Sequence, residues 1–393
     1  MLVTLDSITT KITKGTTPTS VGCTFENSGV NFIKSESLGN SRNIDRSKFA
    51  FISEQTHEKL KRSQIEKNDI LFSMAGMFLG KTGIVTDDLV PANTNQAVAI
   101  IRIDTEKANH EYVYYYLNQR SVIQAVNASS AQSAQPNINL KQIGQIKIDL
   151  PERKLQDKIV SILSAIDFKI EKNNQINENL LEQMQALYKS WFVDYLPFGG
   201  VMPTSWTQTG IYSLANIIYG APFASKQFNT EGNGKPIIRI RDLKDQQFAT
   251  YTTEMHPKGY LLQPGDIVVG MDGEFRPYIW GNDEAWLNQR VCVFENKRPN
   301  GKAFLYFTIK PLLYSIEQTQ VATTVIHIGK KDYDAFEITL PDTTTLDNFD
   351  ALTSPMIMQI VSNSFENKRL SSMRDALLPK LMSGEIDVSS IQL

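Results

Sequence analysis

The chain has 393 residues, of which 41% are hydrophobic, and a formal net charge of −2. This length allows two or three domains with cores of their own. The sequence has no apolar run long enough to cross a bilayer and no signal-peptide pattern after Met1, so it predicts a cytoplasmic protein without a membrane partner. Cys23 and Cys292 lie in opposite halves without the spacing of a disulfide framework or a zinc site, so no metal site is predicted.

Residues 1–150 predict a mixed, strand-rich domain with polar loops. Short apolar runs at residues 30–33, 70–72 and 96–103 are bounded by turn residues, as is typical of strands. Residues 110–118 predict a short buried helix.

A long helical run is predicted over about residues 159–192, and the helix itself is predicted to begin earlier, just after Pro151. Its apolar positions alternate at spacings of four and three residues, which is the seam of a left-handed coiled coil. The same seam recurs 190 positions later in the chain. The seam residues are Ile166, Ile170, Asn173, Asn177, Leu180, Met184, Leu187 and Trp191 in the first copy, and Met356, Ile360, Asn363, Asn367, Leu370, Arg374, Leu377 and Leu381 in the second.

The Asn residues on both seams predict how the helices pair. An Asn facing Leu would be buried without a hydrogen bond, so antiparallel pairing should bring Asn against Asn. The alternative is two ordinary amphipathic helices, each packed on its own domain. Ser354 and Pro355 predict the start of the second seam, and Pro379 predicts a kink or an end near Leu378.

The first domain is repeated in the second half of the chain, because short motifs recur there in the same order. The matched segments are Lys14-Gly15 with Tyr219-Gly220, residues 33–38 with 238–243, 67–70 with 264–267, 95–98 with 288–291, and Asn137 with His327. This pattern indicates a tandem duplication of one unit, a domain followed by a helix. The predicted fold class is α+β, with two pseudo-symmetric mixed α/β domains separated by two long helices that pair as an antiparallel coiled coil. The predicted division is 1–150, 151–198, 199–342 and 343–393.

The length of the helices suggests a function for them. A helix of about 33 residues is roughly 50 Å long, which corresponds to one to two turns of B-DNA at about 34 Å each. The helix pair could therefore act as a ruler between two half-sites. Inserting four residues near Gln175 should then lengthen the gap between them.

The whole chain resembles the specificity subunit of type I restriction-modification enzymes. Residues 186–195 (ALYKSWFVDY) and 377–387 (LLPKLMSGEID) are similar to the helix endings of that family. Residues 8–18 and 67–72 are similar to the starts and central strands of its recognition domains. In the right order, and twice, these weak motifs make a specific match over nearly all of the chain.

The resemblance implies a DNA specificity subunit whose two target-recognition domains read a bipartite, asymmetric DNA sequence. Its implied partners are double-stranded DNA, two methyltransferase subunits and, through the complex, restriction and translocase subunits. The chain would carry no catalysis and no cofactor. Residues 76–82 resemble a phosphate loop but have three residues between their glycines instead of four, so a tight turn presenting Lys81 to DNA is predicted there. Glu366 and Lys368 look nuclease-like, but a solvated helix face explains them.

The candidate DNA-contacting residues are polar side chains near the predicted strand ends, chosen because forked donors and amides read base edges while lysines bind phosphates. They are Lys14, Lys34, Lys81, Asn95, Gln96, Gln135, Asn137 and Lys141 in the first domain, and Arg239, Arg241, Arg276, Gln289, Arg290, His327, Lys330 and Lys331 in the second. Each has an ordinary alternative: Arg239 and Arg241 could be exposed strand residues, and Asn95 could close a turn. The loops of the two domains differ, which predicts two different half-sites.

Two other functions remain open. The chain could be the specificity subunit of a combined nuclease-methyltransferase that cuts on both sides of its site. It could also be an adaptor that does not bind DNA, with two binding domains on a helical rod. Salt dependence distinguishes the adaptor from a DNA-binding protein. Phosphate contacts make DNA affinity fall steeply with salt, whereas binding by the adaptor should depend little on salt.

Overall fold

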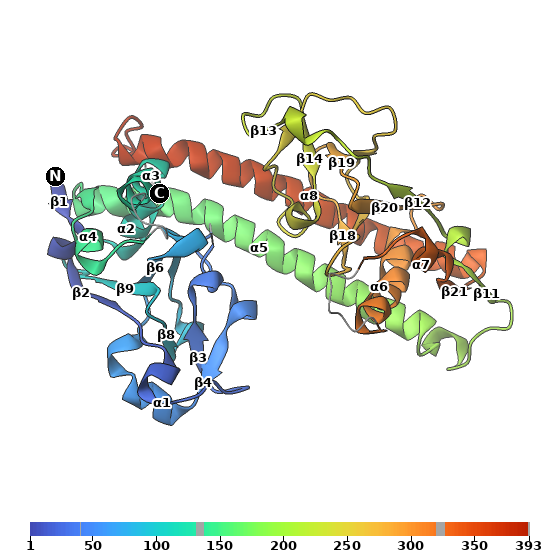
Figure 1. Ribbon diagram of the computed structural model, residues 1–393, viewed down its shortest axis with the longest axis horizontal. Helices are drawn as coiled ribbons and strands as arrows, with labels where there is room; N and C mark the ends of the chain where they lie inside the picture. The colour runs from blue at the N-terminus through green and yellow to red at the C-terminus, as the bar shows by residue number, and fades with distance from the viewer. Residues whose placement is uncertain (40, 131–136, 320–326, 392–393) are drawn as a thin grey trace. The chain divides into compact units, whose positions relative to one another are not determined.

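The computed structural model describes residues 1–39, 41–130, 137–319 and 327–391. The chain folds as two units, Met1–Phe168 with Ser371–Leu393, and Lys169–Leu370. Each unit contains a β-rich domain and parts of two long helices (Figure 1). Within the described residues, the longest helices are too polar to cross a membrane.

The domain of unit 1 is built on two four-stranded sheets. One has the antiparallel order β2 (Thr9–Lys14), β9 (Val98–Ile103), β6 (Ile70–Ser73), β7 (Thr82–Ile84). The other has the order β4 (Ala50–Ile52), β3 (Val30–Ile33), β8 (Ala92–Thr94), β5 (Gln64–Ile65), with β3 and β8 parallel. A short pair joins β1 (Leu2–Thr4) to β10 (Lys147–Asp149). The helices are α1 (Glu54–Lys59), α2 (His110–Leu117), α3 (Arg120–Ser130) and α4 (Leu140–Gly144).

Unit 2 repeats this topology, with one additional strand at the edge of its second sheet. Its antiparallel sheet has the order β12 (Ala215–Tyr219), β20 (Val291–Asn296), β17 (Ile267–Gly270), β18 (Pro277–Ile279). Its second sheet has the order β13 (Phe228–Asn229), β15 (Tyr251–Thr252), β14 (Lys235–Ile238), β19 (Ala285–Leu287), β16 (Leu261–Leu262), with β14 and β19 parallel. β11 (Thr207–Gly210) pairs with β21 (Glu337–Leu340). The helices are α6 (Lys302–Thr319) and α7 (Lys330–Asp334).

The repeated motifs have structural causes. A Cβ on Gly15 would lie 2.0 Å from the carbonyl oxygen of Thr94, and a Cβ on Gly220 would lie 2.0 Å from that of Asn288. Glycine is therefore required directly after β2 (Thr9–Lys14) and after its counterpart at Ala215–Tyr219, because the backbones approach too closely there for a side chain. The predicted short runs form β3, β6 and β9, and the predicted buried helix forms α2, whose Tyr112 is fully buried.

Two helices of 40 residues each, α5 (Arg153–Phe192) and α8 (Thr343–Met382), follow the domains. Within unit 2 they run antiparallel, since Asn173 Nδ2 donates to Asn367 Oδ1 at 2.9 Å and Asn363 Nδ2 donates to Asn177 Oδ1 at 2.8 Å. The predicted α+β fold with an antiparallel helix pair is confirmed.

The predicted start at Pro355 was wrong, because Pro355 lies inside α8. The predicted end near Leu378 was also wrong, because α8 continues to Met382, and a kink at Pro379 stays a prediction. The helix begins twelve residues before Pro355, at Thr343, where Asp342 Oδ1 accepts a hydrogen bond from Thr345 N at 2.9 Å. It then continues because its next turns are buried: Phe349 is fully covered in the core of unit 2. Pro379 is overridden in the same way by the burial of Leu378 and Leu381 in unit 1. Tertiary packing here outweighs a local cost of roughly 3 kcal/mol per proline.

Candidate nucleic-acid interface

Three chain segments meet at the end of β6 in unit 1. Met74 N donates to the carbonyl oxygen of Ala97 at 2.7 Å, and Ile138 N donates to the carbonyl oxygen of Met74 at 2.9 Å. Ala75 also forms a bridge with Asn137. We call this meeting point junction 1. It connects a buried central strand to the turn after β8 and to the segment before α4.

Unit 2 builds the same meeting point, which we call junction 2. Met271 N donates to the carbonyl oxygen of Arg290 at 2.9 Å, and Ile328 N donates to the carbonyl oxygen of Met271 at 3.0 Å. Asp272 forms a bridge with His327. The central strand β17 thus fixes two loops by backbone hydrogen bonds, which do not depend on which side chains the loops carry. Such a scaffold leaves the side chains at the junction free to differ.

Junction 1 carries amide side chains. Asn95 Oδ1 accepts a hydrogen bond from Ala97 N at 3.1 Å. Asn95 therefore closes the turn, which is the role given above as the alternative to DNA contact. Gln96 is exposed and its amide oxygen bonds to the hydroxyl of Thr17, and Asn137 is exposed beside them.

Two lysines lie near junction 1. Lys14 is half-buried at the end of β2. Lys34 directly follows β3, the strand parallel to β8, and lies 5.3 Å from the centre of the Phe25 ring. Because β3 and β8 are parallel and end side by side, Lys34 and Asn95 both lie at the carboxyl end of these strands.

Junction 2 carries a charged cluster instead. Arg290 Nη1 lies 3.2 Å from His327 Nδ1, and Arg290 Nε lies 3.7 Å from Asp272 Oδ2. His327 Nδ1 also bonds to Asp272. Arg290 and His327 are each about half exposed, at 51% and 48%, so the cluster lies on the surface. Sequence reasoning missed Asp272. The sequence feature that could have identified Asp272 is its position two residues after the apolar run of β17.

The structure places the remaining candidates in two groups. Two arginines are bound within the domain: Arg239 to Asp242 at 3.2 Å, and Arg276 to Glu317 of α6. The others are at least partly accessible. These are Lys81 at the turn before β7, Lys141 on α4, Arg241, Gln289 beside junction 2, and Lys330 and Lys331 on α7, while Gln135 lies outside the described residues. Partial burial lowers the pKa of Lys81.

The structure does not support the resemblance of residues 76–82 to a phosphate loop. Residues 76–82 form the turn between β6 and β7, where Gly80 N donates to the carbonyl oxygen of Ser73 at 3.0 Å. A strand follows the turn, whereas a phosphate loop is followed by a helix whose amino end binds the anion. Across the described residues, no group of three or more His, Cys, Asp or Glu side chains is arranged to hold a metal ion.

The seam residues of both helices are buried or half-buried in the structure. The side chains of Glu366 and Lys368 are 44% and 37% exposed, which fits the solvated face predicted for them, and both also bond to neighbouring side chains. Glu366 accepts a hydrogen bond from Asn173 Nδ2 at 2.8 Å, and Lys368 donates to Asn282 Oδ1 at 2.6 Å. Lys368 also lies 4.5 Å from the centre of the Phe248 ring, so both residues hold α8 in place.

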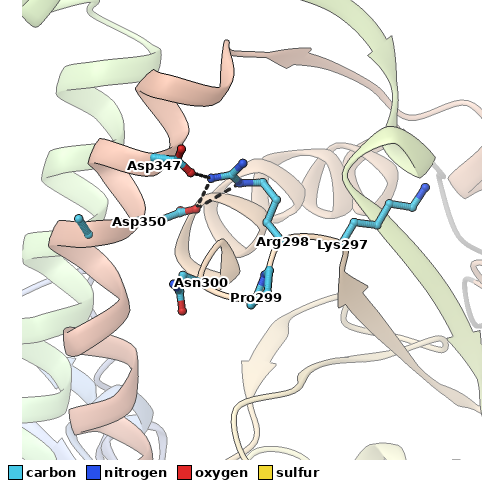
Figure 2. Close-up of a pocket in the computed structure, with 7 residues that line it drawn as sticks. Lys297, Arg298, Pro299, Asn300, Asp347 and Asp350 are labelled. Atoms are coloured by element: carbon cyan, nitrogen blue, oxygen red, sulfur yellow. Dashed lines mark hydrogen bonds and ion pairs between the residues drawn. The ribbon is translucent and has the colours of Figure 1, made fainter.

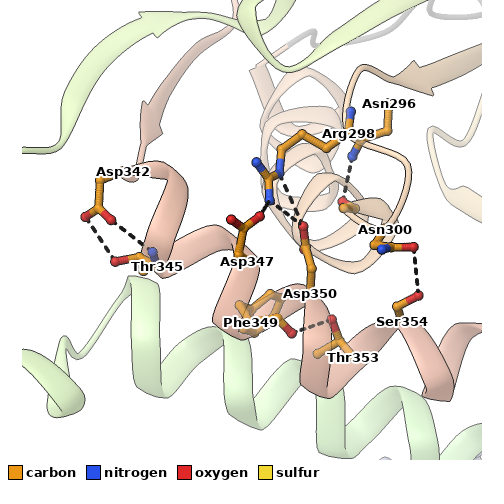
Figure 3. A network of polar contacts seen from close by, with 11 residues as sticks. Asn296, Arg298, Asn300, Asp342, Thr345, Asp347, Phe349, Asp350, Thr353 and Ser354 are labelled. Atoms are coloured by element: carbon orange, nitrogen blue, oxygen red, sulfur yellow. Dashed lines mark hydrogen bonds and ion pairs between the residues drawn. The ribbon is translucent and has the colours of Figure 1, made fainter.

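An ion-pair network attaches the domain of unit 2 to the start of α8 (Figure 2). Arg298, in the loop after β20, bonds to Asp347 at 2.5 Å and to Asp350 at 2.9 Å. Burial raises the pKa of Asp350, while the bonds from Arg298 oppose that rise. Figure 3 shows that Ser354 and Asn300 extend the network, with Ser354 Oγ 3.4 Å from Asn300 Oδ1.

Unit 1 has a corresponding attachment at the start of α5. Asn109, which precedes α2, donates from Nδ2 to Asp157 Oδ1 at 2.8 Å, and its backbone N donates to Gln156 Oε1 at 2.9 Å. Asp157 stands 190 positions before Asp347. The loop that follows the last strand of the antiparallel sheet is thus fastened to equivalent positions of the two helices, so each domain is held on its own helix.

Comparison with known proteins identifies the class. The family model described as the type I restriction modification DNA specificity domain matches residues 1–182 and 203–357, which is most of the chain. The chain therefore belongs to the family of type I restriction-modification specificity subunits, as the motifs predicted. It is the DNA specificity subunit of such a system, a component that is not itself catalytic.

Individual relatives agree with this assignment. The chain is 23% identical to the HindI specificity subunit of Haemophilus influenzae over 83% of this chain and 88% of that protein. It is 25% identical to the MjaIX specificity subunit of Methanocaldococcus jannaschii over 77% of this chain and 74% of that protein. A stronger local match, at 37%, joins 35% of this chain to 29% of the Escherichia coli EcoBI specificity subunit. The S subunit of the M. genitalium type I system has the same fold, with a TM-score of 0.53 at 15% identity over 97% of this chain and 95% of that one.

Proposed function

We propose that junction 1 and junction 2 each read one half of a bipartite, asymmetric DNA sequence. The observation that carries the proposal is the contrast between them: one backbone scaffold occurs twice, with exposed amides at junction 1 and an arginine-histidine-aspartate cluster at junction 2. A scaffold repeated with different exposed side chains is what two different half-sites require. The two half-sites should therefore differ in sequence.

The chemistry of the side chains suggests what each junction contacts. Asn and Gln amides pair with the edge of adenine, and an arginine pairs with the edge of guanine. Gln96 and Asn137 fit the first role, and Arg290, oriented by Asp272, fits the second. Lys14, Lys34 and Lys331 would bind phosphates, which position the protein without reading sequence.

The partners follow from the family. We propose that the chain binds two methyltransferase subunits, that the complex methylates adenine in each half-site, and that restriction and translocase subunits join through that complex. Two repeated units with two helices offer two equivalent docking places. The chain itself would need no cofactor, and its DNA target implies action in the cytoplasm. The four-part division at residues 150, 198 and 342 stays a prediction, since in the structure each helix contributes to both units.

A long-read map of adenine methylation in the source genome, with and without this gene, tests the proposal. Deletion should remove one two-part motif with a fixed gap and two different halves. A single symmetric motif would contradict the assignment of different half-sites. Unchanged methylation, in cells that express the chain and an active methyltransferase partner, would overturn the modification role.

A further inference from the structure

A buried charged layer lies between the helices in unit 1. Arg374 Nη1 of α8 donates to Asp167 Oδ1 of α5 at 2.8 Å, and the hydroxyl of Tyr115 donates to Asp167 Oδ2 at 2.6 Å. The side chains of Arg374 and Asp167 are 19% and 12% exposed. A domain and both helices thus meet at one ion pair that is largely removed from water.

The repeat places an apolar layer at the equivalent position of unit 2. The counterpart of Arg374, 190 positions earlier, is Met184, and the counterpart of Asp167, 190 positions later, is Ile357. Met184 is fully buried and Ile357 is 5% exposed, and both belong to the core of unit 2. The duplicated seam is therefore asymmetric at this layer, whereas the Asn layers are the same in both copies.

This asymmetry matters because each helix could also pair with its own copy in a second chain. In an antiparallel pair of two α5 helices, Asn173 would face Asn177 of the other copy, so the Asn layers would be satisfied. Asp167 would face Met184 at both ends and would lose its cation. In a pair of two α8 helices, Arg374 would face Ile357 at both ends. It would lose the buried carboxylate of Asp167 and keep only that of Asp375, which is 66% exposed.

We propose that the Asp167–Arg374 pair restricts α5 to pairing with α8 and excludes pairing of either helix with its own copy in a second chain. Removing one partner of a buried ion pair leaves an uncompensated charge, which is strongly unfavourable. The Asn layers fix the register of the seam, and the charged layer fixes the identity of the partner. If the proposed function holds, this selection also preserves the asymmetric target, since a pair of like halves would present one recognition domain twice.

The pairing can be tested without DNA, so its failure is separable from failure of the proposed function. A protease site is introduced at Gly199 and Gly200, two residues with positive φ in the segment after α5. The purified full-length chain is cleaved there, isotopically labelled and unlabelled samples are mixed, and native mass spectrometry follows the pairs. For the natural sequence we expect label to exchange while every pair contains one first half and one second half. Pairs of two first halves or of two second halves, in an amount comparable to that of the mixed pairs, would overturn the proposal.

The matched variant gives unit 1 the apolar layer of unit 2. It combines Asp167→Ile and Arg374→Met with Tyr115→Phe, which removes the hydroxyl that would lose its acceptor. We expect pairs of like halves to appear, at least about tenfold above the natural sequence. Asp167→Asn with Arg374→Gln removes the charges at nearly constant shape and should act in the same direction, so a folding defect in the first variant would not decide the result.

The control is an exposed ion pair between the same helices. Lys169 Nζ lies 3.2 Å from Glu366 Oε2, with side chains 50% and 44% exposed. Replacing Lys169 alone with its counterpart in the repeat, Lys169→Gln, breaks this pair but keeps the bond from Asn173 to Glu366. It should leave the sorting unchanged, because exposed ion pairs contribute little. Continued exclusive pairing of unlike halves in both charge-removing variants would overturn the proposal.

Discussion

At the scale of single residues, the two junctions separate side chains that support the fold from side chains available to DNA. Arg239 and Arg290 are both near strand ends, and sequence reasoning could not tell them apart. The structure binds Arg239 to buried Asp242, whereas Arg290 stays half exposed with a surface carboxylate behind it. The difference lies in long-range neighbours, which a local pattern does not contain.

Arg290→Ala should relax specificity at one position of the second half-site. A bidentate contact between arginine and guanine is worth about 1–3 kcal/mol of discrimination, so affinities for the four bases at that position should converge. Binding to duplexes randomised at each position measures this. Lys331→Ala is the control, since losing a phosphate contact weakens binding to all sequences and reduces the salt slope by about one. Equal loss for all sequences in the Arg290 variant would contradict base reading.

Gly15→Ala should destabilise unit 1, because its Cβ would lie 2.0 Å from a backbone oxygen of Thr94 that cannot move aside cheaply. Overpacking of this kind costs about 1–3 kcal/mol or more. Gly329→Ala is the control: it has an extended φ of −146° and no heavy atom within 4 Å of the added Cβ. Urea unfolding of both variants measures the difference. Similar stabilities would show that the close approach can relax.

At the scale of elements, apolar runs predicted strands and helices well because burial repeats with the period of the element. β3 and α2 follow directly from this, and the seam spacing predicted the antiparallel helix pair. The start of α8 could not be predicted from Pro355. Its first turns are polar at Asp347 and Asp350, and they are held by Arg298, a residue almost fifty positions away. Asp272 was missed for the same reason, since its partners come from another loop.

The amino end of α8 should be sensitive to acid through Asp342. The hydrogen bond from Thr345 N, with further bonds from the Thr345 hydroxyl and Trp206, lowers the pKa of Asp342 below 3.8. A lowered carboxyl pKa means that the stabilisation is present above pH 3.8 and is lost as pH falls through the folded value. Asp342→Ala should therefore cost about 1 kcal/mol at pH 7 and less near pH 3.

Free energies of unfolding at both pH values test this, with Glu178→Ala, at an exposed position of α5, as the control. A penalty that is the same at pH 3 and pH 7 would show that the charge of Asp342 does not contribute to the cap.

At the scale of the whole molecule, the question is whether α5 and α8 set the gap between half-sites. The paired Asn layers change how that should be tested, because four residues inserted into α5 alone near Gln175 would move Asn173 and Asn177 out of register with α8. Seven residues inserted into both helices, near Gln175 and Phe365, preserve the heptad pattern and the pairing. They add about 10 Å at 1.5 Å per residue, or about three base pairs at 3.4 Å each.

The expected result is a methylated motif with both halves unchanged and a gap about three base pairs longer, given this rise per residue. Methylation mapping of cells that carry the lengthened chain measures it. Seven residues inserted instead at Gly199 and Gly200, in the segment after α5, should leave the gap as it was, because the helix pair keeps its length. The helices would not set the spacing if the gap stayed unchanged after the insertions into α5 and α8. The same would follow if the insertion at Gly199 and Gly200 lengthened the gap equally.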